Sequence, residues 1–212
     1  MKRLGILLSG RGSNFLAIAD AIDHGQIENA QISIVISNRA EAAGIAAAKS
    51  RGLTTQVVES RGRKRAEQDA EIFACLREHG VELVCLAGYM RLLSPEFVAA
   101  YPHAILNIHP SLLPAFPGLD AQSQALRYGV AITGCTVHFV DEQLDHGVIV
   151  YQRTVPVLEG DDGASLSERI LEQEHVAYPE AIARVLSGNY TIVDRRYVAR
   201  ALHNATLIEE TK

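Results

Sequence analysis

AILNIHPSLLPAFPG, residues 104–118, runs from a short apolar segment into two polar residues and then into a segment with three prolines. In a β-strand, Asn107 and His109 leave the same face because they are two residues apart. The strand must stop at Pro110, since proline cannot donate a hydrogen bond to a sheet. We therefore predict that a strand places an amide and an imidazole at the carboxyl end of a sheet, where open α/β sheets bind ligands.

The chemistry of this pair suits an oxyanion. The carboxamide of Asn107 donates a neutral hydrogen bond, and a protonated His109 donates a charged one. Spacing alone supports equally well an Asn and a His that end a strand and satisfy a turn.

The sequence around this stretch predicts an α/β fold. Apolar runs that read as buried strands lie at 4–8, 32–36, 54–58, 81–86 and 104–108. Helical segments alternate with them, and the fourth of these segments begins with Ser94 as cap and Pro95 at the first position. Strands without polar alternation belong in a sheet covered on both faces. The expected fold is a doubly wound, mostly parallel sheet.

The pattern changes in the C-terminal part of the chain. Two longer alternating strands, at 131–140 and 148–155, are joined by the short loop Asp141–Gly147, which favours an antiparallel pair. Residues Ser165–Glu168 match a capping box ahead of a long helix to about Leu186. One more short strand is expected at 190–193.

Composition narrows the class of function. The formal charge of −5 over 212 residues argues against a nucleic-acid partner, because phosphate neutralisation needs clustered positive charge. No segment approaches the roughly 20 apolar residues of a membrane span. Cys75, Cys85 and Cys135 fit neither a disulfide framework nor a zinc site, so reduced thiols in a cytoplasmic protein are expected.

A glycine-rich turn, Ser9–Asn14, follows the first strand and opens a helix. Glycine lets the backbone approach a ligand closely, and a helix N-terminus presents free N–H groups, so this turn favours a phosphate. A dinucleotide fingerprint lacks its third glycine, since Phe15 stands in that place. An NADP site that uses Arg39 and a turn that binds nothing stay open as alternatives.

Two further residues lie on one face of the strand 131–140. Thr136 and His138 are two apart, and we interpret them as supports of the site or as structural residues. A metal site from His109, His138 and Asp145 has suitable ligand types, but no metal-binding spacing such as H-E-x-x-H supports it. We therefore predict no metal.

The segment HPSLLP followed by PG, with Asn-x-His before it, resembles the folate-dependent formyltransferases, and among them those that act on glycinamide ribonucleotide in purine synthesis. The resemblance implies a Rossmann-like formyltransferase fold in a single domain, 1–212, with a phosphate-binding half at 1–103 and a folate-binding, catalytic half at 104–212. It implies direct transfer of the formyl group of 10-formyltetrahydrofolate to the ribonucleotide amine through a tetrahedral intermediate. Both small molecules would be partners of a monomer or homodimer.

The resemblance also assigns site residues. The catalytic residues would be Asn107, His109 and Asp145, and the carboxylate would favour the imidazolium form of His109. The ribonucleotide would contact Gly12, Ser13 and Asn14 through its phosphate, and Leu171, Glu172, Gln173 and Glu174 through its sugar and amide. The folate would contact Asn107 again, together with Arg65, Met90, Arg91, Leu92, Leu93, Asp141, Glu142, Gln143, Leu144 and Asp145. The neighbouring Arg61 and Arg63 stay open as alternatives to Arg65.

Without the resemblance, these segments have plainer interpretations. Residues 87–93 read as core packing, 141–147 as a bare turn and 173–175 as a solvated helix face. Two residues depart from the family pattern: Asp120 stands where a histidine is frequent, and His146 where glycine is common.

Three rival functions remain to be weighed. They are a 10-formyltetrahydrofolate hydrolase, a formyltransferase for another amine, and a catalytically silent binding protein. The Gly12-Ser13-Asn14 turn disfavours the first two, and the set Asn107, His109 and Asp145 disfavours the third.

Overall fold

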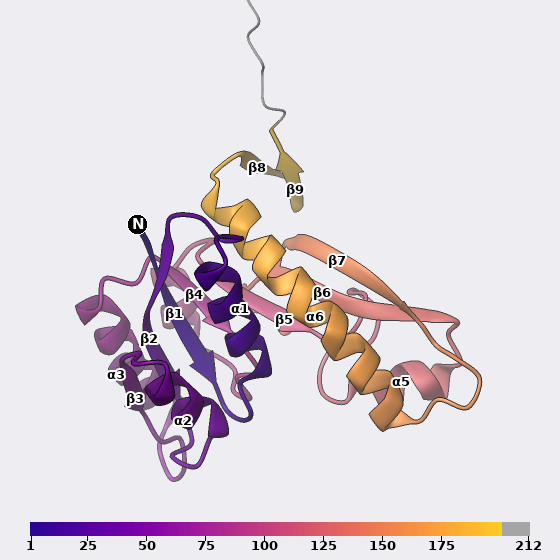
Figure 1. The fold of residues 1–212 in the computed structure, drawn as a ribbon, viewed down its shortest axis with the longest axis horizontal. Coiled ribbons are helices and arrows are strands. Elements are labelled where there is room, and N and C mark those ends of the chain that lie inside the picture. The colour runs from indigo at the N-terminus through magenta and orange to yellow at the C-terminus, as the bar shows by residue number, and fades with distance from the viewer. Residues whose placement is uncertain (201–212) are drawn as a thin grey trace, which may run out of the picture.

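Figure 1 shows a computed structural model of the chain, which describes residues 1–200. Its central sheet has seven strands in the order β3-β2-β1-β4-β5-β6-β7. Their bounds are β1 Lys2–Leu8, β2 Ala30–Ser37, β3 Thr55–Val57, β4 Leu83–Leu86, β5 Ile105–His109, β6 Ile132–Phe139 and β7 Ile149–Pro156. The strands from β3 to β5 are parallel, and β6 and β7 are antiparallel to their neighbours. The predicted mostly parallel sheet with an antiparallel C-terminal part is confirmed.

Helices cover both faces of the sheet, as the uninterrupted apolar strands predicted. Their bounds are α1 Ser13–Asp23, α2 Ala43–Ser50, α3 Arg65–Glu78, α4 Pro95–Ala100, α5 Ala121–Tyr128 and α6 Gly163–Leu186. Because side chains alternate along a strand, Ile6 and Leu8 pack with α1, α2 and α6, whereas Leu7 packs with α3 and α4 on the other face. The long α6 crosses the front of the sheet beside α1 (Figure 1).

The strand order reverses between β1 and β4, and this places two loops together. The turn after β1 touches the loop after β4, because the Ser9 amide donates to the Gly88 carbonyl at 3.1 Å. In return the Met90 amide donates to the Ser9 hydroxyl at 2.8 Å. Such a switch point in an open α/β sheet is where ligands bind. The fold therefore brings the predicted phosphate turn against the start of the predicted folate segment.

Tyr178 of α6 fixes that helix across the same region. Its fully buried hydroxyl lies 3.1 Å from the carbonyl oxygen of Leu86 in β4 and 2.9 Å from that of Leu106 in β5. A buried hydroxyl without a partner is destabilising, so these contacts hold α6 in one place over the strand ends. Asn107 directly follows Leu106 in β5, so the bond from Tyr178 also fixes the backbone that carries Asn107.

The helix start predicted at Ser94 and Pro95 is confirmed, since the Ser94 hydroxyl accepts from the Phe97 amide. The capping box predicted at Ser165–Glu168 was wrong. The cap is Asp162, whose carboxylate accepts from the Ala164 and Ser165 amides, while the Ser165 hydroxyl accepts from the Asp162 amide. A carboxylate at the cap is also stabilised by the positive end of the helix dipole. The helix α6 therefore begins three residues earlier than predicted.

The chain continues past α6 into a two-stranded antiparallel hairpin, β8 Tyr190–Val193 and β9 Arg196–Ala199. The short strand predicted at 190–193 is therefore present, with a partner that the sequence pattern did not indicate. In the part of the chain that the structure describes, no helix is long and apolar enough to cross a membrane.

Candidate active site

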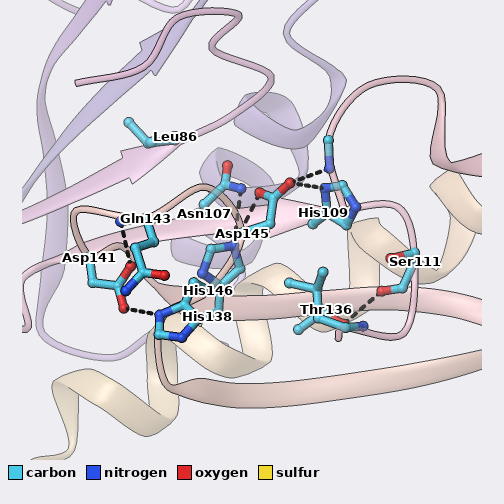
Figure 2. Close-up of polar contacts among 12 residues, drawn as sticks. Leu86, Asn107, His109, Ser111, Thr136, His138, Asp141, Gln143, Asp145 and His146 are labelled. Atoms are coloured by element: carbon cyan, nitrogen blue, oxygen red, sulfur yellow. Dashed lines mark hydrogen bonds and ion pairs between the residues drawn. The ribbon is translucent and has the colours of Figure 1, made fainter. Parts of the chain in front are cut away.

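The site is built on a pair of neighbouring strands, β5 and β6. Their antiparallel register sets Asn107 opposite His138 and His109 opposite Thr136. Directly opposed residues on one face lie close enough for their side chains to interact. The two pairs that the sequence placed on strand faces are thus one cluster of four side chains (Figure 2).

His138 fixes the orientation of the Asn107 amide. Its Nδ1 lies 2.8 Å from the carbonyl oxygen of Phe139, which can only accept, so Nδ1 carries a proton. Burial is the largest influence on His138 and lowers its pKa, which leaves the ring neutral and Nε2 free to accept. Nε2 lies 3.2 Å from Asn107 Nδ2, so the amide must present its NH2 group to the ring. The second hydrogen of that NH2 group remains for a ligand.

His109 has an oxygen acceptor beside each of its ring nitrogens. Nε2 lies 2.9 Å from the Phe116 carbonyl oxygen, and Nδ1 lies 3.3 Å from Asp145 Oδ2. Only 6% of the His109 side chain and 7% of the Asp145 side chain are exposed. A ring flanked by a carbonyl and a carboxylate matches the form that is protonated on both nitrogens. The arrangement therefore suits an imidazolium beside the Asn107 amide.

Asp145 reaches the site from the 141–147 loop that joins β6 and β7. Figure 2 shows its carboxylate between Asn107 and His109. Oδ2 accepts from the Gly118 amide at 2.7 Å, and Oδ1 lies 3.8 Å from His138 Nε2. Asp145 has φ 49°, a left-handed conformation that most L residues avoid, so the loop holds this side chain against a local preference.

Thr136 anchors the proline-rich segment that follows His109. Its hydroxyl donates to the Ser111 carbonyl at 2.6 Å and accepts from the Leu113 amide at 3.0 Å. Gln152 of β7 donates to the same hydroxyl and to the Leu113 carbonyl. Because the segment 110–117 carries the Phe116 carbonyl, these contacts set where the His109 ring can donate.

The turn after β1 forms a second part of the site. A pocket of about 270 Å³ is lined by the turn Ser9–Asn14, by Ala87, Gly88 and Met90 of the neighbouring loop, and by Arg39. Gly12 lies at the start of α1 with φ 78°, and no side chain among residues 1–200 caps that helix. Its first amides are therefore free for an anion.

Two arginines lie at this pocket. Arg11 was not a predicted site residue, and Arg39 was named only for the alternative of an NADP site. Arg11 and Arg39 both line the pocket and both are exposed. The charge of Arg11 also reaches His175 of α6, where it adds to the larger effect of burial in lowering the histidine pKa. Cations that flank free helix amides complement a phosphate. The sequence contained a signal for them, since Arg11 stands inside the glycine-rich turn and Arg39 follows the second strand.

Glu174 of α6 lies beside the same turn. Its Oε2 accepts from Asn14 Nδ2 at 2.7 Å in a buried contact, and Asn14 Oδ1 has no partner in the described part of the chain. Burial, the larger effect, raises the pKa of Glu174, while the bond from Asn14 lowers it. A protonated Glu174 has an O–H group that can serve the unpaired amide oxygen. The pair thus links α1 and α6 next to the pocket.

Glu174→Gln is expected to make the protein more stable at alkaline pH. The folded-state pKa of Glu174 is raised above its ordinary value of 4.5, so its stabilising contribution is complete below pH 4.5 and is lost as the pH rises through the folded-state pKa. Glutamine stays neutral and can donate to Asn14 Oδ1. Urea unfolding at pH 4 should give wild type and variant similar midpoints, and at pH 8 the variant should unfold at higher urea. Glu172→Gln, on the exposed side of α6, is the control and should follow wild type throughout.

Comparison with known proteins decides the family. The sequence model of the formyl transferase family matches residues 2–182. The chain belongs to the formyl transferase family. The phosphoribosylglycinamide formyltransferase of Escherichia coli (strain K12) is 40% identical over 184 residues, which are 86% of this chain and 86% of that relative. Glycinamide ribonucleotide transformylase 1 from Symbiobacterium toebii matches in structure with a TM-score of 0.91, at 47% identity and 94% coverage of both chains.

A longer relative is also similar. The human trifunctional purine biosynthetic protein adenosine-3 is 48% identical over 187 residues, or 88% of this chain. The chain spans only 18% of the length of that relative, so the similarity concerns one part of a larger protein.

Apart from Asn107 on β5, the folate contacts expected from the formyl transferase resemblance lie on two loops and one helix start. Met90 and Leu92 are 62% and 50% exposed, which is more than core packing of 87–93 would allow, whereas Leu93 packs on the α3–α4 side of the core. Arg91 donates to the Ser60 carbonyl at 3.1 Å, and Arg65 is exposed at the start of α3.

The second loop with expected folate contacts is 141–147. Leu144 is 55% exposed there, and Glu142 and Gln143 are also exposed. The Asp141 carboxylate accepts from the Gln143 amide. Their contacts with folate remain predictions.

The residues expected along α6 of this formyl transferase are divided between its sides. Glu174 faces the turn after β1, and Gln173 accepts from Arg153 of β7 at 2.7 Å. Glu172 is exposed, and two residues correspond to about 200° around a helix, so it leaves the side opposite Glu174. Leu171 is half-buried. A role of all four in substrate binding remains a prediction, for which Glu174 has the most suitable position.

Among the described residues, no group of three or more His, Cys, Asp and Glu side chains is arranged to hold a metal ion. His138, which the metal alternative required, already has Phe139 at Nδ1 and Asn107 at Nε2. The functional groups at the site are the hydrogen-bond donors of Asn107 and His109 and the carboxylate of Asp145. Such a set can stabilise negative charge on an oxygen and move a proton.

Proposed function

We propose that this chain is a phosphoribosylglycinamide formyltransferase, which transfers the formyl group of 10-formyltetrahydrofolate to the amine of glycinamide ribonucleotide. One observation carries the proposal. The Asn107 amide, the His109 ring and the Asp145 carboxylate meet at the same sheet edge as a pocket that suits a phosphate. The names of the E. coli and S. toebii proteins support the choice of substrates, since both are named for this ribonucleotide.

In the proposed reaction, the ribonucleotide amine attacks the formyl carbon and forms a tetrahedral intermediate with a negatively charged oxygen. The free hydrogen of Asn107 Nδ2 and the charge of His109 stabilise that oxygen. The intermediate collapses by breaking the bond between the formyl carbon and the folate N10. The proton lost by the amine passes to N10, directly or through water, with Asp145 as the carrier.

Asp145 has a second role in the proposal. Its charge beside His109 Nδ1 stabilises the imidazolium, and its bond from the Gly118 amide holds the carboxylate in place. The reaction needs no covalent enzyme intermediate, because the two substrates are held side by side. The exposed apolar side chains of Met90, Leu92 and Leu144 would line the place of the folate ring.

The test is an assay for tetrahydrofolate release from 10-formyltetrahydrofolate, with and without glycinamide ribonucleotide. We expect release to depend on the ribonucleotide and to equal the amount of formylated product. Release at the same rate without the ribonucleotide would identify a hydrolase. No release under either condition, with both ligands bound, would identify a binding protein.

Arg11→Ala and Arg39→Ala are each expected to raise the KM for the ribonucleotide about tenfold, because each removes a charge-assisted contact with the phosphate. The kcat should change little, since the phosphate does not react. Lys49→Ala, at the far end of α2, removes the same charge away from the pocket and is the control. The riboside that lacks the phosphate should react equally with all variants. Unchanged KM values in both arginine variants would exclude these two side chains from phosphate binding.

The proposal places the enzyme in the cytoplasm. Cys75, Cys85 and Cys135 are free thiols, as expected in a reducing compartment.

A further inference from the structure

The two strands of the hairpin that follows α6 are joined by a tight turn, whose backbone conformation is unfavourable for Arg195. Val193 pairs with Arg196, so the turn between β8 and β9 consists of Asp194 and Arg195 alone. Their φ values are 45° and 65°, as in a type I′ turn. Asp is frequent in such a turn, but the second position favours glycine, and an arginine there needs a compensating contact.

That contact is with the 141–147 loop, on which Asp145 lies. Arg195 Nη2 donates to the carbonyl oxygen of His146, and Nη1 lies 3.2 Å from His146 Nδ1 and 4.0 Å from Asp141 Oδ2. His146 Nδ1 in turn lies 2.8 Å from Asp141 Oδ2. One guanidinium group therefore touches the backbone at one end of the loop and the carboxylate at the other. The fork of an arginine can make such paired contacts, which a single ammonium group cannot.

The base of the hairpin rests on the core and gives this contact a firm support. Tyr190 stacks on Phe139, with ring centroids 6.2 Å apart, and Tyr197 stacks on Tyr190 at 4.6 Å. The Tyr197 hydroxyl donates to the carbonyl of Arg184 in α6 at 3.2 Å. Phe139 is buried and ends β6, two residues before the loop begins. The hairpin is thus attached to the strand from which the loop departs, and its tip reaches the far end of the same loop.

The position of the contact matters because His146 directly follows Asp145. Asp145 is held at a left-handed φ. On the other side of His146, Gly147 passes so close to the Phe139 carbonyl that a side chain there would overlap it. The His146 carbonyl is the backbone acceptor between these two constrained residues. A donor bound to it restricts the rotation that would carry the Asp145 carboxylate away from His109.

We propose that Arg195 is a positioning residue, which holds the 141–147 loop so that Asp145 faces His109. This inference rests on the proposed function, in which Asp145 takes part in formyl transfer. The β8–β9 hairpin then restrains the active-site loop and contributes to the reaction without contact with either substrate.

Arg195→Gly is the decisive variant, because it removes the contact while it improves the turn. Its thermal midpoint should stay within about 2–4 °C of wild type, which corresponds to a change of roughly 1 kcal/mol in a protein of this size. Arg196→Ala is the matched control, since it removes an equal charge one residue away. Within residues 1–200, the Arg196 side chain forms no hydrogen bond or ion pair with the 141–147 loop. Arg195→Lys keeps the positive charge but loses the planar guanidinium group that can donate to two acceptors at once.

Two measurements test the inference. Amide hydrogen exchange of residues 141–147, without substrates, should become about tenfold faster in Arg195→Gly and stay unchanged in Arg196→Ala. The kcat of formyl transfer should fall about tenfold in Arg195→Gly, with the KM for the ribonucleotide unchanged and Arg195→Lys intermediate. A merely structural role would change neither kcat nor loop exchange at constant thermal stability.

Each other outcome decides against the inference or against its premise. Wild-type exchange in Arg195→Gly would show that the contact does not restrain the loop. Faster exchange with an unchanged kcat would show that restraint of the loop does not serve the reaction. If the wild-type protein transfers no formyl group to the ribonucleotide, the proposed function fails, and the exchange measurement still tests the restraint because it needs no substrate.

Discussion

Replacing Asn107 with alanine is expected to lower turnover by about 10²–10³-fold, the usual cost of losing one donor to a developing oxyanion. The amide donates one hydrogen to His138 Nε2 at 3.2 Å, and the other is the proposed donor to the formyl oxygen. The loss should appear in kcat rather than in the KM for the ribonucleotide, because the contact strengthens only as charge develops. Steady-state assays of formyl transfer at saturating concentrations of both substrates would measure it.

Asn189→Ala is the control for this variant. Asn189 is exposed between α6 and β8, so the same truncation there should leave the rate unchanged. The Asn107→Ala protein must still unfold cooperatively near the wild-type temperature, because its neighbours Leu106 and Ile108 keep their places in the core. Near-normal turnover in a folded Asn107→Ala protein would remove the amide from the mechanism.

Asp145→Asn is expected to reduce kcat by about 10²–10⁴-fold, the range for a group that carries a proton in the transition state. The amide cannot carry that proton, and it no longer stabilises a charged His109 ring at 3.3 Å. Steady-state rates of formyl transfer at saturating concentrations of both substrates would measure the loss.

The matched control is Glu159→Gln, which removes one negative charge at an exposed position after β7. Its rate should equal that of wild type. A wild-type rate in a folded Asp145→Asn protein would contradict both proposed roles of Asp145.

The sequence predicted the strands and the class of the sheet, because these signals are local, but it did not predict the strand order. Uninterrupted apolar runs indicated strands covered on both faces, and the spacing of two placed Asn107 and His109 on one face of β5. The start of α4 at Ser94 and Pro95 was also evident, since a cap and its proline are neighbours. The start of α6 was predicted at the wrong cap, because Asp162 and Ser165 both have capping side chains and only the path of the preceding loop selects between them.

The site itself was predicted less completely. The resemblance to the formyltransferases suggested Asp145 as the partner of His109, but 36 residues separate them, and no periodicity relates the two. His138 was left between a support and a structural histidine, since its contact with Asn107 depends on the register of β6 against β5. Arg11 stood in the predicted glycine-rich turn and Arg39 followed the second strand, but only the strand order brought both to one pocket.

By itself, the sequence determined an α/β fold and placed an amide and an imidazole on one face of a strand, because the alternation of side chains is a property of the chain alone. Only the tertiary structure decided three contacts. His138 orients the Asn107 amide, Asp145 lies against His109, and Arg195 binds the 141–147 loop, which carries Asp145. These contacts join residues that are 31, 36 and 49 positions apart in the sequence. Such residues meet only after strand pairing and the packing of α6 and the hairpin have fixed the position of each loop.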